Sequence, residues 1–236
     1  DGTVNEELTK TEPGDQLKTS SSSSYYYTEG LKNSTTTNTH AKNITIFRKK
    51  AESSHGYYIG RYESRTNTPR TSKTPDDKLT QITTKPDDYV YNYVRQSQAA
   101  KLSREMYSGT PFESDLINSY AWDTATLFLQ TFDNRTNKDS LKKYSRQTSL
   151  NTDSVGLAYK GTNNLAEASK KDKICNVYDM ASNCFEWSTE TFSNSSRPCT
   201  GRGGYCYNSG DYTSSRDING TTYSSYSYSF RPLLYL

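Results

Sequence analysis

The stretch NVYDMASNCFEW, residues 176–187, decides the fold of this chain. Residues 176–180 have the Asn and Asp content of a turn, whereas residues 185–190 alternate aromatic and polar side chains as a strand does. A second turn signal follows at residues 193–196, and the next strand is predicted to open at Arg202. The sequence therefore predicts a run of short strands in this part of the chain.

Helical patterns precede these strands. Residues 94–107 carry apolar side chains at helical spacing, and a second, more apolar helix is predicted to start at its cap Asn118. Short strands are predicted at residues 43–47 and 56–63, and a last strand at residues 228–236. Two helices with short antiparallel strands and much irregular loop predict an α+β domain.

The domain organisation follows from shifts in composition. Residues 1–44 are rich in Ser, Thr, Asn and Lys without apolar periodicity, and they are predicted to form a flexible Ser/Thr-rich stalk or linker. The folded domain is predicted to span residues 45–236. Inside it, the polar stretches 66–88 and 133–171 are predicted to be long loops. Both tryptophans of the chain are predicted to lie in the core.

The composition excludes some classes of function. The formal net charge is +3 over 236 residues, and Lys and Arg are interspersed with acidic residues, so nucleic acid is excluded as the main partner. The hydrophobic content is 31%, the mean hydropathy is −0.97, and no stretch reaches the roughly 18 apolar residues that span a bilayer. Because the sequence starts at Asp1 and not at Met, we expect a membrane connection only through an anchor upstream of it.

The four cysteines lie in the C-terminal third and lack the Cys-x-x-Cys spacing of zinc and redox sites. Cys184 and Cys199 lie symmetrically about residues 191–192, near the predicted turn, so a hairpin could bring them together as a disulfide. Such a disulfide would indicate an oxidising, extracellular setting. The alternative is two buried thiols. Cys175 and Cys206 stay unassigned.

Five pieces of the sequence resemble the formylglycine-generating-enzyme (sulfatase-modifying-factor) branch of the C-type lectin fold. They are GYYIGRYE (56–63), LINSYAWDTA (116–125), NVYDMASNCFEW (176–187), RGGYCY (202–207) and SFRPLL (229–234), and they occur in the family's order. The resemblance implies a C-type lectin fold from Gly56 to the end of the chain. The sequence departs from the family at Ser182, Phe185 and Ser229, where the family usually has Gly, Trp and Gly.

The resemblance does not extend to catalysis. Enzymes of this branch bind copper and activate oxygen with two cysteines, placed eight and three residues before an arginine near the C-terminus. Counting back from Arg216, these positions hold Asn208 and Thr213. Without two thiolates, neither a copper site nor oxidase chemistry is expected, so the chain is predicted not to be an enzyme and to require no cofactor. The calcium motifs of sugar-binding lectins are missing from the sequence as well.

A structural calcium ion is a further implication of the resemblance. Asp179 and Glu186 match positions at which the enzyme branch carries calcium, with backbone carbonyls completing the shell. The alternative is that Asp179 is a turn residue and that Glu186 is paired with a basic side chain.

The segment from Arg202 to Phe230 consists mainly of Tyr, Ser, Asn, Asp, Thr and Gly, the composition that antibody contact surfaces use. It resembles the variable region of the phage or bacterial variable proteins of diversity-generating retroelements, which display a hypermutated surface on the C-type lectin fold. The resemblance implies an invariant scaffold of Arg202, Gly203, Gly204, Arg216, Phe230 and Arg231. The implied variable, ligand-binding positions are Tyr205, Tyr207, Asn208, Ser209, Asp211, Tyr212, Ser214, Ser215, Asp217, Asn219, Tyr223, Ser225, Tyr226 and Tyr228.

The sequence therefore predicts a receptor or adhesin without catalytic activity, which binds an unknown protein or cell-surface ligand. Its expected location is extracellular, at a bacterial cell surface or on a phage virion. A structural pilus or phage-tail component, which would self-assemble, is one alternative. An accessory domain of an enzyme with a fixed partner is another, and an oxidase of the formylglycine-generating type is disfavoured by the missing cysteine pair.

Overall fold

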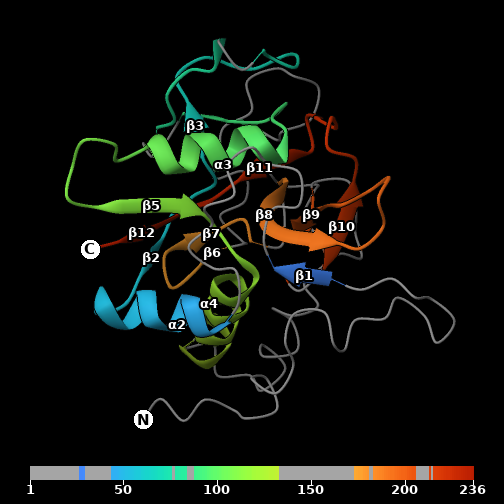
Figure 1. Cartoon of the computed structure of the whole chain (residues 1–236). Coiled ribbons are helices and arrows are strands. Elements are labelled where there is room, and N and C mark those ends of the chain that lie inside the picture. Colours follow the sequence, from blue (N-terminus) through green and yellow to red (C-terminus); the bar gives the residue numbers. More distant parts are fainter. Residues whose placement is uncertain are drawn as a thin grey trace, which may run out of the picture.

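The computed structural model describes residues 27–29, 44–75, 78–83, 88–132, 173–180, 183–205, 213 and 215–236. The described helices are α2 (Ile44–Ser53), α3 (Gln96–Glu105) and α4 (Ser119–Phe132), and short strands make up the other described elements (Figure 1). The strands are β1 (Tyr27–Glu29), β2 (Tyr58–Ile59), β3 (Arg65–Thr66), β4 (Tyr89–Val90), β5 (Glu113–Leu116), β6 (Lys173–Ile174), β7 (Val177–Tyr178), β8 (Phe185–Phe192), β9 (Cys199–Arg202), β10 (Arg216–Asn219), β11 (Tyr228–Phe230) and β12 (Pro232–Tyr235). The predicted α+β class is confirmed.

Strand β8 is the centre of the largest sheet, whose strand order is β1-β8-β9-β10. All eight residues of β8 are buried. Strand β9 pairs with it in an antiparallel hairpin, whereas β1 pairs with its last residues and β11 pairs in parallel with its first. A second sheet has the order β2-β12-β5 and is antiparallel throughout. Because β11 and β12 follow each other directly, the end of the chain joins the two sheets (Figure 1).

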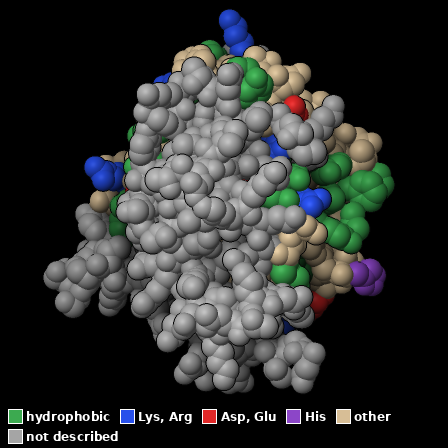
Figure 2. Space-filling view, turned by 180° about the vertical axis from the view of Figure 1, so that it is seen from behind, with side chains coloured by type: hydrophobic (Ala, Val, Ile, Leu, Met, Phe, Trp, Pro, Cys, Tyr) green, Lys and Arg blue, Asp and Glu red, His purple; other side chains and the backbone are tan. Residues whose placement is uncertain are grey.

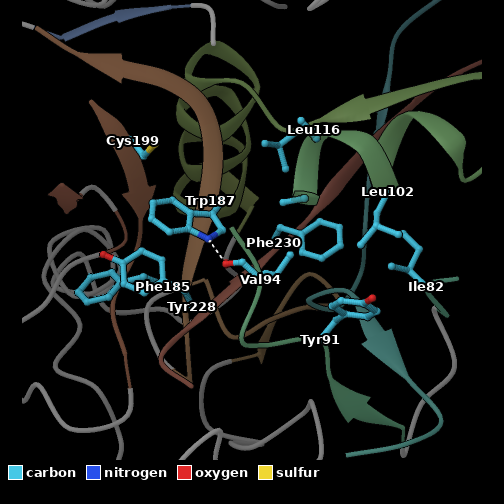
Figure 3. Packing of buried hydrophobic residues seen from close by; sticks show 12 residues of the cluster. Ile82, Tyr91, Val94, Leu102, Leu116, Phe185, Trp187, Cys199, Tyr228 and Phe230 are labelled. Carbon is cyan, nitrogen blue, oxygen red and sulfur yellow. Dashed lines mark hydrogen bonds between the residues drawn. The ribbon is translucent and has the colours of Figure 1, made fainter. Parts of the chain in front are cut away.

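The apolar residues pack into two main clusters. One lies between α2, α4 and β12, where the rings of Phe47 and Tyr120 stack with their centroids 6.0 Å apart. The other lies between α3 and the strands β8 and β11, and it contains Trp187. The indole N–H of Trp187 donates to the Val94 carbonyl at 2.8 Å (Figure 3). Trp122 and Trp187 are both fully buried, as predicted.

Both predicted helices are confirmed. Helix α3 lies within the predicted residues 94–107, and α4 starts directly after its predicted cap. The Asn118 carboxamide oxygen accepts a hydrogen bond from the Ala121 N–H at 2.9 Å, which satisfies a backbone donor of the first turn. The turn predicted at residues 193–196 closes the β8–β9 hairpin, where the Phe192 N–H donates to the Pro198 carbonyl at 2.9 Å.

The strand predicted at residues 43–47 is wrong, because residues 44–47 belong to helix α2, while residue 43 lies outside the described residues. The alternation that favours a strand is only five residues long, and the residues that follow it are good helix formers. The helix ends where Gly56, with φ +125°, donates its N–H to the Ala51 carbonyl at 2.7 Å. A positive φ of this kind favours glycine and stops the helix.

Three strand predictions need correction. Arg202 ends β9 instead of opening a strand, and the long strand predicted at residues 228–236 is divided into β11 and β12. The division is physical, since β11 pairs with β8 in the first sheet and β12 with β2 and β5 in the second. The strand predicted at residues 56–63 is short, since β2 covers Tyr58 and Ile59 only.

Part of the predicted stalk is also wrong. Tyr27–Glu29 form β1 and pair with residues 190–192 of β8, so these residues belong to the sheet. The loop predicted at residues 66–88 holds an isolated bridge between Arg65 and Thr83 in its described part. The loop predicted at residues 133–171 lies outside the described residues.

A few large apolar side chains of the described residues are exposed. None of the described helices is both long and apolar enough to cross a membrane. Figure 2 shows hydrophobic side chains gathered along one edge of the molecule. The exposed large hydrophobic residues of the described part are Tyr58, Phe112, Leu127, Phe128, Tyr223 and Leu236.

Candidate ligand-binding surface

Three arginines of the C-terminal segment bind two glutamates of β8. Arg202 Nη1 lies 3.1 Å from Glu190 Oε2, and Arg216 Nε lies 2.6 Å from Glu190 Oε1. Arg231 binds Glu186 with two nitrogens, Nη2 to Oε1 at 2.5 Å and Nε to Oε2 at 2.9 Å. Both glutamates, Arg202 and Arg231 are fully buried. Breaking one of these buried ion pairs would leave an uncompensated charge in the core. The pairs therefore hold the C-terminal segment in one position against β8.

Helix α4 completes this network from the other side. The Ser119 hydroxyl donates to Glu190 Oε2, and Arg202 Nη2 lies 2.5 Å from Asp123 Oδ1. The indole N–H of Trp122 donates to the Thr213 carbonyl at 2.8 Å. Thr213 is fully buried, and its carbonyl anchors the backbone to α4.

A glycine lets the chain leave β9 close to a neighbouring turn. Gly203 has φ +79°, and a Cβ atom there would lie 2.4 Å from the Met180 carbonyl oxygen. Its N–H donates to the Ser215 carbonyl at 3.1 Å, so the chain departs and returns at one place. The predicted scaffold residues Arg202, Gly203, Gly204, Phe230 and Arg231 are all buried, and the side chain of Arg216 is 13% exposed.

The described candidate contact residues lie between these anchors. Tyr223 is 39% exposed, and the others that retain partial exposure are Tyr205, Ser215, Asp217, Asn219, Ser225 and Tyr226. Apart from Tyr228, the remaining candidates lie outside the described residues, namely Tyr207, Asn208, Ser209, Asp211, Tyr212 and Ser214. The structure thus brings part of the predicted surface together along β10 and the turn that follows it.

Tyr228 is a correction to the predicted contact surface, because it is only 1% exposed. Its ring packs against Trp187 with centroids 4.2 Å apart, and a Cβ atom on Gly201 would lie 2.7 Å from its Cε1 (Figure 3). The hydroxyl donates to Asp217 Oδ2 and accepts from Asn219 Nδ2 at 2.8 Å. Burial and the Asp217 carboxylate raise the pKa of Tyr228 well above its ordinary value. Tyr228 therefore supports the surface from below and does not form part of it.

Two partly exposed tyrosines flank Tyr228. The Tyr205 ring packs on Phe185 with centroids 5.0 Å apart, and Phe185 in turn lies 5.4 Å from Tyr228. Tyr223 meets Tyr228 edge to face at 5.4 Å and 82°. The exposed rings therefore rest on buried rings, so they offer apolar contact area whose position the core fixes.

The predicted disulfide between Cys184 and Cys199 is wrong, because both residues carry thiols. In the β8–β9 register, Cys199 lies opposite Thr191, seven residues beyond Cys184. Seven residues of strand span about 23 Å, far more than a disulfide bridges. Cys184 packs against Val90, and burial raises the pKa of the Cys199 thiol to about 12. Cys175 is exposed, and Cys206 lies outside the described residues.

Asp179 and Glu186, the residues considered for calcium, are both buried. Glu186 directs both carboxylate oxygens to Arg231, which matches the alternative of a paired Glu. Asp179 is 1% exposed and has φ +60°, as a turn residue can. Among the described residues, no group of three or more His, Cys, Asp or Glu side chains is arranged to hold a metal. These contacts match the alternative of a turn residue and a paired glutamate.

A third carboxylate, which the sequence did not point to, lies beside this pair. Glu63 is 1% exposed and accepts hydrogen bonds from Asn183 Nδ2 and, at 3.1 Å, from the Cys184 N–H. Burial raises the pKa of Glu63 well above its ordinary value of 4.5, and the charges of Glu186 and Asp179 raise it further. Its isolated place in the sequence carries no signal of this contact.

Glu190 is the other functional residue that the sequence did not indicate. It lies four residues after Glu186, so strand periodicity places the two side chains on the same face. That spacing, together with three arginines in the last segment, is the signal from which the pairing could have been inferred.

The comparisons with known proteins leave the family open. No protein-family model matches the sequence, and no curated protein matches it. Among solved structures, the chain is similar to one described as the crystal structure of CarF, at 12% sequence identity and a TM-score of 0.45. The similarity covers 81% of this chain and 82% of that chain. A similarity at this level identifies neither the fold family nor the function.

Proposed function

We propose that the chain is a ligand-binding protein with the C-type lectin fold of the formylglycine-generating-enzyme branch, and that it acts as a receptor or adhesin without catalytic activity. Its contact surface is the Tyr-, Ser- and Asn-rich segment between Arg202 and Phe230. We propose further that a retroelement diversifies this segment, so that related proteins carry other residues at the same positions.

One observation carries the proposal. The arginines at the start, middle and end of the segment bind buried glutamates of a single strand, whereas polar side chains between them keep partial exposure. Side chains on a fixed backbone can be exchanged with little loss of stability, which is what a contact surface with changing specificity requires. Tyrosines resting on buried rings supply contact area at low entropic cost.

The expected partner is a protein or another ligand at a cell surface, and the expected location is extracellular, at a bacterial surface or on a phage virion. No cofactor is needed for this function, and nucleic acid is not expected as a partner.

A binding screen tests the proposal. The full chain is labelled and presented to a panel of intact bacteria and to arrays of surface proteins and glycans. Beside it runs a variant with Tyr207→Ala, Tyr212→Ala and Tyr223→Ala. We expect the wild type to bind at least one target and the variant to lose about tenfold or more in affinity, since buried Tyr anchors dominate such contacts. The melting temperature should change little.

Three results would argue against this function. A variant that binds as well as the wild type would place the contact elsewhere, and concentration-dependent filaments in sedimentation would indicate a structural component. Stoichiometric copper binding would indicate oxidase chemistry. Diversification has its own test: relatives that vary no more at residues 202–230 than at residues 96–130, with no near-copy of this segment beside a reverse transcriptase gene, would contradict it.

A further inference from the structure

Asp217 and Asn219 form a fixed pair on β10, the strand at the edge of the main sheet. Asn219 Nδ2 donates to Asp217 Oδ2 at 3.1 Å and to the Tyr228 hydroxyl at 2.8 Å. The Tyr228 hydroxyl in turn donates to the same Asp217 oxygen. Because an ionised carboxylate only accepts hydrogen bonds, the amide of Asn219 must turn its nitrogen toward Asp217. The buried ring of Tyr228 therefore sets the orientation of both side chains.

The groups left over on this pair are acceptors. Both donor positions of the Asn219 amide nitrogen are used within the triad, and so is the hydroxyl proton of Tyr228. Among the described residues, no group donates to Asp217 Oδ1 or Asn219 Oδ1, and no basic side chain pairs with Asp217. Both side chains are only half-buried. The pair thus keeps two acceptor oxygens and one negative charge that the triad does not use.

An aromatic ring packs on the tyrosine that holds this pair. Tyr223 follows β10 in a turn closed by its N–H, which donates to the Gly220 carbonyl at 3.0 Å. It is 39% exposed and packs edge to face on Tyr228, the same ring whose hydroxyl holds Asp217. The surface therefore combines a carboxylate, an amide oxygen and an exposed ring.

Because Asp217 and Asn219 have only hydrogen-bond acceptors left, they favour a ligand group that donates hydrogen bonds. A saccharide hydroxyl both donates and accepts, so a site for it normally supplies both kinds of partner. Guanidinium and ammonium groups only donate, they carry the opposite charge, and they are attracted to the faces of aromatic rings. We propose that Asp217, Asn219 and Tyr223 bind an arginine or lysine side chain presented by a protein ligand. This inference rests on the proposed function, since it names what one part of that surface contacts.

Small probes test the proposal without knowledge of the natural partner. The full chain, labelled with ¹⁵N, is titrated with N-acetyl-arginine amide, with its neutral isostere N-acetyl-citrulline amide and with methyl glucoside, while the amide shifts are followed. We expect the arginine probe to shift residues 217, 219 and 223 and to bind about tenfold more tightly than citrulline, because hydrogen bonds to a charged group are the stronger ones. Added salt should weaken it.

Variants locate the effect. Asp217→Asn keeps the shape and removes the charge, and should weaken the arginine probe about fivefold or more, whereas Tyr223→Ala removes the ring and should weaken it less. Glu52→Gln, at an exposed acidic residue of α2, is the matched control and should change nothing. The comparison of arginine with citrulline on the wild type needs no variant, so it stands even where Asp217→Asn lowers stability.

Several outcomes would overturn the proposal. Equal binding of citrulline, preferential binding of the glucoside, or shifts confined to other residues would each do so. The failure of every probe to shift these residues at millimolar concentration would overturn it too. None of these results would contradict the proposed binding function, which the screen with cells and arrays tests separately.

Discussion

Tyr228 shows at the scale of one residue what composition can and cannot predict. Its neighbours in the sequence, Ser227 and Ser229, and the other tyrosines of the segment give no sign that this ring is buried. The distinction comes from pairing, because Tyr228 lies opposite Phe185 in the sheet and its ring reaches across Gly201. The composition indicated that the whole segment forms a contact surface. Only the strand pairing shows which of its residues lie at the surface and which support it from below.

Tyr228→Phe should reduce the free energy of unfolding by about 1–2 kcal/mol, because it removes two hydrogen bonds and leaves the ring in place. Tyr223→Phe, the matched control at an exposed ring, should change it by no more than about 0.5 kcal/mol. Urea denaturation measures both. Equal effects would mean that Tyr228 is no more structural than Tyr223.

The cysteines provide a second test at this scale. In the native protein, an alkylating reagent should modify the exposed Cys175 and leave Cys184 and Cys199 untouched, since both are buried and the pKa of Cys199 is about 12. Both should react once the chain is unfolded, without added reductant. Peptide mass spectrometry distinguishes the sites. Detection of two peptides linked through Cys184 and Cys199 would show that the disulfide forms and would contradict this prediction.

At the scale of elements, local signals predicted what local interactions decide. Helices α3 and α4 were found because their apolar spacing and the Asn118 cap lie within each helix. The strand predicted at residues 43–47 failed, because a short alternation does not exclude a helix that continues beyond it. The predicted pairing of Cys184 with Cys199 failed for a related reason. It depends on the register of β8 against β9, which the sequence of the hairpin alone does not fix.

At Gly203, where the chain leaves β9, adding a single methyl group is expected to lower the stability strongly. Gly203→Ala should destabilise the protein by about 3 kcal/mol or more, since it adds a clash with the Met180 carbonyl to the cost of a positive φ. Gly109→Ala is the control, because its φ is +81° and no atom lies within 4 Å of its added Cβ. It should cost about 1 kcal/mol. Thermal melts compare the two, and similar losses would exclude the close approach.

At the scale of the whole molecule, buried charge ties the C-terminal segment to the rest of the chain. The resemblance placed Arg202, Arg216 and Arg231 in a scaffold, and all three bind glutamates of β8. The spacing of Glu186 and Glu190 hints at pairing, but which arginine meets which glutamate is fixed only by the fold, because the partners lie far apart along the chain. The same holds for Glu63, which meets Glu186 and Asp179 only through the fold.

Glu63 predicts how stability depends on pH. Its pKa is raised in the folded protein, chiefly by burial, so the folded state holds this proton more tightly than the unfolded state. The resulting stability is fully present below the ordinary pKa of 4.5 and is lost as the pH rises through the folded pKa. Glu63→Gln, which mimics the protonated form, should therefore gain relative to the wild type as the pH rises. Denaturation of both proteins at pH 5, 6, 7 and 8 measures the difference, and Glu52→Gln should show no such trend. A constant difference would mean that Glu63 is ionised throughout.

The free energy of unfolding, measured by urea denaturation on two variants, decides whether the segment is a replaceable surface on a fixed frame. The combined variant Thr222→Ala, Tyr223→Ala and Ser225→Ala should lose at most about 1.5 kcal/mol, because each position tolerates change. Glu190→Gln alone should lose about 3 kcal/mol or more, since it leaves Arg202 and Arg216 without their shared carboxylate. If the triple variant instead lost as much as Glu190→Gln, the segment would belong to the core and could not serve as an exchangeable contact surface.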